Sequence, residues 1–278
     1  MSSLIKLDGS YGEGGGALLR AALSVSVLTQ QSFQIENIRT GTKYVGLDVE
    51  DVVLIKTLAE LTNADVSEYG LGTLSLLFSP KQSLKPLRAV IPAIRDERKR
   101  GPNALVLATT LAPLLARSGG YSDFEIEGET FSNSSMTYDF LAEVVMPVWR
   151  KMNLYVSPEI HRAAYDRVTE GRCRFEVEPA SLTALHALDR GAPKLFTAKI
   201  TSTKGQRAYI DRITSHLNKL ARSMRVPFNV DVTDVRGDQS AQFLTLCIQF
   251  ESGMGGAGCM GSWRVEPEQI AQTAFDKL

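Results

Sequence analysis

A glycine-rich stretch near the start of the chain has the residue types of an anion-binding loop. Residues 12–16 hold four glycines and one carboxylate, directly before an apolar segment with helical spacing. Glycine lets backbone N–H groups approach a ligand closely, and a helix N-terminus presents unpaired donors and a positive dipole end. We therefore expect Gly14, Gly15 and Gly16 to bind a phosphate or another anion. The same pattern also fits a tight strand-to-helix turn that binds nothing.

Basic side chains extend this candidate site. Arg20 lies one turn inside the expected helix, and Arg39 and Lys43 follow the next expected strand. Arginine offers a planar fork of donors to a phosphate or carboxylate, whereas lysine offers a compact point charge. We predict that these three cations bind the same anion as the glycines.

Carboxylates next to the same segments are candidates for catalysis. Glu13 sits inside the glycine loop, where it could bind a metal ion, act as a general base, or cap the first turn of the helix. Three more carboxylates follow Lys43 within eight residues: Asp48, Glu50 and Asp51. If the acidic and basic groups share one cleft, they suit a small polar substrate and acid–base chemistry.

Other common sites are not indicated. The glycines are not followed by the Gly-Lys-Ser/Thr of a P-loop, and they lack the spacing of a dinucleotide fingerprint. The cysteines Cys173, Cys247 and Cys259 are far apart and show no metal-ligand spacing. We therefore predict no resident metal site.

The elements that must position these residues alternate between strands and helices. Apolar spacing predicts strand, helix, strand, helix, strand and strand at 4–7, 17–29, 33–39, 46–62, 65–69 and 74–79. The same order recurs at 88–94, 102–116, 123–127, 136–152, 154–159 and 173–178, with Pro147 expected to kink or shorten the last helix. A strand–helix–strand–strand module follows at 194–201, 206–224, 228–235 and 243–251. A brief strand at 263–265 and a helix from residue 267 end the chain.

These elements predict an α/β fold of repeated βαβαββ units with a small inserted βαββ domain. We assign residues 1–184 and 262–278 to the large domain and residues 185–261 to the insertion. The glycine-rich residues 253–261 are interpreted as a flexible turn back to the large domain, in preference to a second ligand loop. Residues 181–188 are interpreted as a short helical piece.

Two segments resemble the RNA 3′-terminal phosphate cyclase family. Residues 8–20 (Asp-Gly-Ser-Tyr-Gly-Glu-Gly-Gly-Gly-Ala-Leu-Leu-Arg) are similar to its opening signature, and residues 38–47 (Ile-Arg-Thr-Gly-Thr-Lys-Tyr-Val-Gly-Leu) to its Ile-Arg-x-Gly…Pro-Gly-Leu stretch. The resemblance implies the repeated α/β architecture with a small insert. It also implies binding of ATP with Mg²⁺ and of an RNA end, with Arg20, Arg39 and Lys43 at the nucleotide or RNA-end site.

The chain departs from the family pattern in two important places. Where the family has Arg-Gln-His after Gly-Leu, this chain has Asp-Val-Glu-Asp at 48–51, with three carboxylates. The family's adenylylated histidine lies in the final part of a third repeat, where this sequence reaches Leu278. The three histidines of this chain fall in other segments. They are His161, in an expected loop, His186, in the expected short helical piece, and His216, on the surface of the insert helix. We therefore expect binding of ATP, phosphate or an RNA end without the family's cyclisation reaction.

Bulk charge places limits on the partners. Lys plus Arg and Asp plus Glu are equal at 31 each, so no global attraction to nucleic acid is expected. Binding of nucleic acid would therefore need a local basic patch. Residues 95–100 contain four basic and two acidic side chains. They form either a basic edge that faces a phosphate or a solvated loop whose charges pair with each other. No apolar stretch has the length of a membrane span. We expect a cytoplasmic or nuclear protein.

Three functions remain open at this point. The first is a diverged cyclase-like protein that binds a nucleotide or an RNA end. The second is a non-catalytic RNA or ribosome-assembly module, and the third is an enzyme repurposed for a small polar molecule. The short third repeat also predicts an incompletely covered apolar face, which a homo-oligomer would bury.

Overall fold

The computed structural model describes residues 4–132, 135–261 and 265–278. The chain divides into two compact units. Unit 1 comprises residues 1–127 and 175–181, and unit 2 comprises residues 128–174 and 182–278. These boundaries differ from the divisions at 184/185 and 261/262 expected from the sequence.

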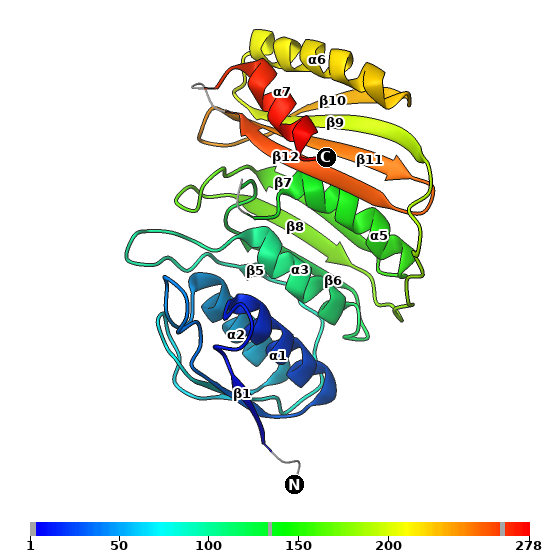
Figure 1. The fold of residues 1–278 in the computed structure, drawn as a ribbon. Helices are drawn as coiled ribbons and strands as arrows, with labels where there is room; N and C mark the ends of the chain where they lie inside the picture. The colour runs from blue at the N-terminus through cyan, green and yellow to red at the C-terminus, as the bar shows by residue number, and fades with distance from the viewer. Residues whose placement is uncertain (1–3, 133–134, 262–264) are drawn as a thin grey trace. The chain divides into compact units, whose positions relative to one another are not determined.

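Unit 1 begins with one complete βαβαββ unit, as the sequence predicts. Its four strands pair in the order β1-β2-β4-β3, with β1 and β2 parallel and β4 antiparallel to both β2 and β3. Figure 1 shows α1 and α2 side by side next to this sheet. The elements are β1 (Ile5–Asp8), α1 (Gly16–Thr29), β2 (Phe33–Glu36), α2 (Val49–Thr62), β3 (Asp65–Val66) and β4 (Leu76–Ser79).

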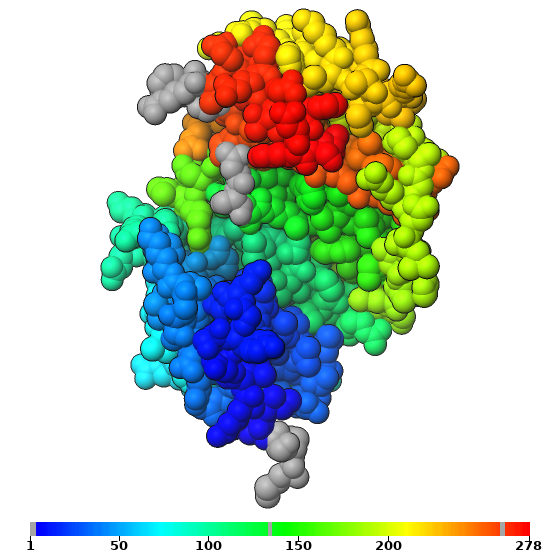
Figure 2. Space-filling view, in the orientation of Figure 1, coloured from blue at the N-terminus to red at the C-terminus, as the bar shows by residue number. Residues whose placement is uncertain are grey.

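Alternation along the strands and helical spacing along α1 build the core of this unit. Phe33 and Phe78 are opposite each other in the ladder, and each is at most 2% exposed. Leu19 and Leu23 of α1 are buried, whereas Val25 and Leu28 are 55% and 51% exposed. The segment from β1 through α1, dark blue in Figure 2, lies at the surface in that view.

The second sheet repeats the order of the first. Its strands pair in the order β5-β6-β8-β7, so each strand holds the position of its counterpart in the first sheet. This confirms the repeated βαβαββ order predicted from the sequence. The elements are β5 (Val90–Ile91), α3 (Ala104–Leu115), β6 (Ser122–Glu127), α4 (Tyr138–Phe140), the π-helical turn η1 (Leu141–Val145), α5 (Met146–Lys151), β7 (Val156–Arg162) and β8 (Arg172–Val177).

The helix expected at 136–152 is interrupted by that π-helical turn. The Met146 N–H donates to the Leu141 carbonyl, five residues back, in place of the usual four. Pro147 follows at once, near the start of α5. The sequence predicted that Pro147 would kink or shorten the helix. The helical run continues through Pro147 to Lys151, so it is not shortened at the proline, and the π-helical turn lies directly before it.

The third module lies within unit 2 and contains the expected strand–helix–strand–strand order. Its sheet has the order β10-β9-β11-β12, with β9 parallel to β10 and antiparallel to β11. The elements are β9 (Pro193–Thr203), α6 (Arg207–Ala221), the short 3₁₀ helix η2 (Arg222–Met224), β10 (Phe228–Asp234), β11 (Ala241–Phe250), β12 (Met254–Gly261) and α7 (Pro267–Asp276).

The glycine-rich segment 253–261 was expected to be a flexible turn, and that expectation is wrong. Residues 254–261 form β12, which pairs antiparallel with β11 from Gln249↔Met254 to Gln242↔Gly261. The glycines make room for neighbouring side chains. A Cβ on Gly258 would lie 2.6 Å from the Phe243 ring, and one on Gly256 would lie 2.8 Å from Val144. Glycine here permits close packing on a regular strand.

The final helix packs with the third module. Ile270, Ala271 and Ala274 of α7 are buried in one core with Phe196 of β9 and Leu217 of α6. From the sequence we assigned residues 262–278 to the large domain, whereas α7 packs in the core of the third module. The brief strand expected at 263–265 falls mostly on residues 262–264, which lie outside the described residues.

Candidate functional site

The glycine loop joins β1 to α1 in unit 1. Gly12 and Gly14 have φ angles of +68° and +61°, a region that glycine enters without strain. The Asp8 carboxylate accepts hydrogen bonds from the Ser10 N–H at 3.0 Å and the Ser10 hydroxyl at 2.8 Å, which fixes the start of the turn. Gly15 is the N-cap of α1 and has no side chain to cap it. The loop therefore delivers the uncapped start of a helix.

Two guanidinium groups converge on Gly16, the first residue of α1. A Cβ placed on Gly16 would lie 2.3 Å from Nη2 of Arg39 and 2.7 Å from Nη1 of Arg20. The same Cβ would lie 3.3 Å from Oδ1 of Asp51. We call this place the Gly16 site, made of Gly14, Gly15, Gly16, Arg20, Arg39 and Asp51. It combines two cations with the positive end of a helix dipole.

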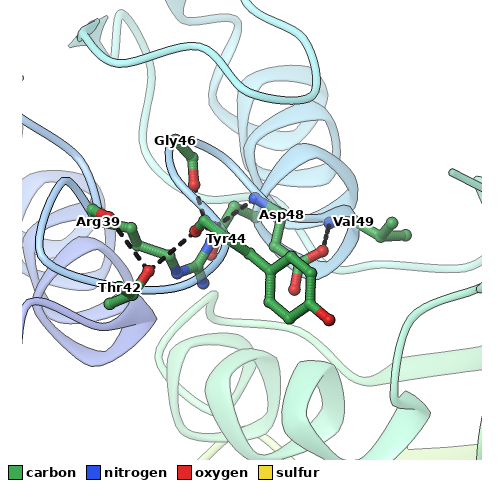
Figure 3. Close-up of polar contacts among 7 residues, drawn as sticks. Arg39, Thr42, Tyr44, Gly46, Asp48 and Val49 are labelled. Carbon is green, nitrogen blue, oxygen red and sulfur yellow. Dashed lines mark hydrogen bonds and ion pairs between the residues drawn. The ribbon is translucent and has the colours of Figure 1, made fainter.

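Asp51 holds Arg39 in place. The Arg39 guanidinium forms an ion pair with Oδ2 of Asp51 and donates to the Gly46 carbonyl at 3.2 Å (Figure 3). Arg39 itself adopts φ +52°, which is uncommon for a residue with a side chain. Asp51 is 1% exposed, and Oδ1 has no hydrogen-bond partner among the described residues. Burial raises the pKa of Asp51, and the charge of Arg39 opposes that rise.

The charge of the Gly16 site is unevenly compensated. Arg39 is neutralised in part by Asp51. Arg20, which is half-buried, makes no ion pair with any residue that the structure describes. The arrangement thus supplies one cation held rigidly by a carboxylate and one available to an anionic ligand.

Two of the other predicted carboxylates, Asp48 and Glu50, bind backbone groups at helix starts. Asp48 is the N-cap of α2 and forms a capping box with Asp51, and its Oδ1 accepts from the Val49 N–H at 2.8 Å. Oε1 of Glu50 accepts from the Asn103 N–H at 3.1 Å, immediately before α3. Glu13 lies in the glycine loop with an exposed side chain. Of the four predicted catalytic carboxylates, Asp51 is the one with an oxygen among the three described atoms nearest to a Cβ on Gly16.

Lys43 lies beside an aromatic ring that sequence reasoning did not select. Nζ of Lys43 is 5.5 Å from the centroid of the Tyr44 ring. The guanidinium carbons of Arg98 and Arg100 are 5.9 and 5.1 Å from the same centroid. The basic run 95–100 was noted from the sequence, but its contact with residue 44 joins segments more than fifty positions apart. The available signal was an aromatic residue directly next to Lys43.

The three histidines all belong to the sequence of unit 2. His161 was expected in a loop, but it belongs to β7, with Nε2 3.3 Å from Oε2 of Glu159. His186 is exposed, and the short helix expected at 181–188 is not present. His216 lies on α6 as expected, half-buried, with Nε2 3.3 Å from the Gln272 side-chain oxygen.

Within the described part of the chain, no group of three or more His, Cys, Asp or Glu residues is arranged to hold a metal ion. No helix in the same ranges has the length and apolar character needed to cross a bilayer.

Comparisons with known proteins agree on one family. The profile of the family described as RNA 3′-terminal phosphate cyclase matches residues 11–260. A cyclase of that name from Nostoc punctiforme is 26% identical over 280 residues, covering 99% of this chain and 80% of the relative. One from Methylococcus capsulatus is 27% identical, covering 99% and 77%. One from Koribacter versatilis is 33% identical over 192 residues, covering 68% and 52%.

Proposed function

The chain belongs to the RNA 3′-terminal phosphate cyclase family, and on that premise we propose that its Gly16 site binds the phosphate of an RNA 3′ end or of ATP. The observation that carries the proposal is the convergence of Arg20 and Arg39 on Gly16, in the space that a Cβ would fill. A phosphate there meets two guanidinium groups and the start of α1.

The residues present fit a phosphate group. Glycine at the first helical position adds no side chain over the backbone N–H groups, and Arg20 makes no ion pair with a described residue. The ion pair with buried Asp51 holds the Arg39 guanidinium in one orientation before the ligand arrives. ATP would bring its own phosphates and any Mg²⁺ bound to them.

We further propose that these 278 residues bind without forming a covalent adenylate. No histidine occurs in the sequence of unit 1, and the described contacts of His161 and His216 are with Glu159 and Gln272. Asp48 and Glu50 hold backbone N–H groups at helix starts, which favours a positioning role over acid–base catalysis. Incubation with ATP labelled at the α-phosphate, followed by denaturing electrophoresis, should leave the polypeptide unlabelled; a labelled band would contradict this.

Calorimetric titration tests the binding proposal. The ligands are ATP with Mg²⁺ and one oligonucleotide in two forms, ending in a 3′-phosphate and in a 3′-hydroxyl. We expect heat with ATP or with the phosphorylated form, and a loss of about 1.5–3 kcal/mol of binding free energy in Arg20→Ala, the scale of a charged hydrogen bond. Arg88→Ala removes an exposed arginine of the same unit and is the matched control. Absence of heat with both ligands would refute the proposal.

A further inference from the structure

An exposed aromatic ring in unit 1 is surrounded by cations from two separate segments. We call Lys43, Tyr44, Arg98 and Arg100 the Tyr44 cluster. The three cationic groups lie 5.1–5.9 Å from the ring centroid, within cation–π range. Tyr44 as a residue is 44% exposed, so it can be reached by a ligand from solvent.

The cluster has an excess of positive charge. Asp96 forms an ion pair with Arg100 at 2.7 Å and accepts from the Arg98 N–H at 2.9 Å. Lys43 and the Arg98 side chain make no ion pair with any described residue. The positive charge of Lys43 is the main cause that lowers the pKa of the Tyr44 hydroxyl. Because the chain as a whole carries no net charge, this excess is a local feature.

Both segments of the cluster are held by their own hydrogen bonds. The Thr42 hydroxyl lies 2.9 Å from the Tyr44 carbonyl and 3.1 Å from the Arg39 carbonyl, which ties the ring's segment to the Gly16 site. Figure 3 shows the Tyr44 ring projecting away from these hydrogen bonds. In the second segment, Asp96 accepts from the backbone N–H groups of Arg98 and Arg100. The backbone of both segments is therefore held in place before any ligand binds.

An exposed ring with flanking cations is the combination that binds unpaired nucleotides. A base stacks on the ring whatever its sequence, and the cations bind the phosphates on either side. We propose that the Tyr44 cluster binds single-stranded RNA, with a base on Tyr44 and backbone phosphates on Lys43 and Arg98. This proposal rests on the proposed function and extends it: the strand that leads to the 3′ end is held here, and its terminal phosphate at the Gly16 site.

Fluorescence anisotropy with a labelled single-stranded RNA tests the proposal. The probe ends in a 3′-hydroxyl, so that binding does not depend on a terminal phosphate. Tyr44→Ala should weaken binding about five- to hundredfold, the range for loss of one stacked base, whereas Tyr44→Phe should retain most of the affinity. Tyr155→Ala, which removes another tyrosine of similar exposure (45%), is the control and should bind like the wild type.

A probe with abasic sites separates stacking from charge. The affinity for this probe should be the same in Tyr44→Ala as in the wild type, but it should fall in Lys43→Ala and in Arg98→Ala. Each of these two variants should also reduce the slope of log affinity against log salt concentration by somewhat less than one unit. Melting temperatures of all variants confirm that they are folded. Equal affinities of Tyr44→Ala and Tyr155→Ala for the intact RNA would overturn the proposal. The proposal would also be overturned if a polyglutamate peptide competes fully with the RNA and if Tyr44→Ala weakens binding of the peptide as much as binding of the RNA.

Failure of this proposal is distinguishable from failure of the proposed function. If Arg20→Ala abolishes a preference for the 3′-phosphorylated RNA while Tyr44→Ala changes nothing, the Gly16 site stands and the Tyr44 cluster does not. If Tyr44→Ala weakens the 3′-hydroxyl RNA while no preference for a 3′-phosphate exists, the cluster stands and the Gly16 site fails.

Discussion

Replacing Gly16 with alanine should separate anion binding from stability. The new Cβ would lie 2.3 Å from Nη2 of Arg39 and 2.7 Å from Nη1 of Arg20. Ordinary contact between heavy atoms begins near 3.5 Å, so each guanidinium must move by about 1 Å. Both groups are the far ends of flexible side chains, so the backbone can stay where it is. Gly16→Ala should therefore fold.

The expected loss of affinity exceeds the expected change in stability. Displacing one guanidinium from a bound phosphate removes about 1.5–3 kcal/mol of binding free energy, or roughly 10- to 150-fold in affinity. Alanine favours helix over glycine by up to about 1 kcal/mol, and this gain opposes the cost of moving the Arg39 guanidinium relative to Asp51. Urea unfolding of the same variant shows how much of the loss of affinity comes with a loss of stability.

Gly70→Ala is the matched control for this experiment. Gly70 belongs to the same unit but not to the Gly16 site, and no heavy atom of the described residues, apart from its chain neighbours, lies within 4 Å of the position that its Cβ would take. Calorimetric titration with ATP–Mg²⁺ and urea unfolding should be run on both variants. If Gly16→Ala and Gly70→Ala bind the ligand equally well, the guanidinium groups at Gly16 do not form the site, and the reasoning is refuted.

Three further predictions concern other parts of the chain. Arg39→Ala removes the cation that faces buried Asp51, so urea unfolding should show that the free energy of unfolding drops by roughly 3–5 kcal/mol. Adding Asp51→Asn should recover most of that loss, and no recovery would contradict the pairing. Burial raises the pKa of Asp139 to about 7, despite the hydrogen bond from Thr201 and the charge of Lys199. The folded state then keeps a proton that the unfolded state releases near pH 4, so the free energy of unfolding falls as pH rises toward 7. Asp139→Asn should restore up to roughly 4 kcal/mol of that free energy at pH 8 but little at pH 4. A gain in stability that does not depend on pH would count against the raised pKa. Val25 and Leu28 are exposed on α1, a helix that also lines an apolar groove of about 240 Å³. Light scattering should therefore show self-association, and the double variant Val25→Ser/Leu28→Ser should abolish it. A strict monomer at high concentration would contradict this prediction.

Sequence periodicity predicted most of the architecture because each element carries its own pattern. Both βαβαββ repeats and the βαββ order of the third module were predicted, since apolar spacing is a local property. Element ends were less accurate. The helix expected from residue 46 begins at Val49, because Asp48 and Asp51 form the capping box there. The segment 253–261 was misassigned, since the reason for its glycines is Phe243, a residue on the paired strand.

The candidate site was predicted as a set of residues but not as an arrangement. The glycine loop and the arginines were selected for their chemistry, and the structure brings Arg20 and Arg39 to Gly16. Four carboxylates were selected in the same way, yet Asp48 and Glu50 bind backbone N–H groups at the starts of α2 and α3. Composition alone does not distinguish a capping carboxylate from a catalytic one. Contacts between distant segments, such as Tyr44 with Arg98, have no local signal at all.

The most direct test of the central claim is an NMR titration of protein labelled with ¹⁵N-glycine. Adding a nucleoside 3′-phosphate should shift the backbone N–H resonances of Gly14, Gly15 and Gly16 in a saturable manner, and Arg20→Ala should weaken that response. If those three resonances stay in place while the ligand binds elsewhere, or if the ligand does not bind at all, the start of α1 is not the anion site.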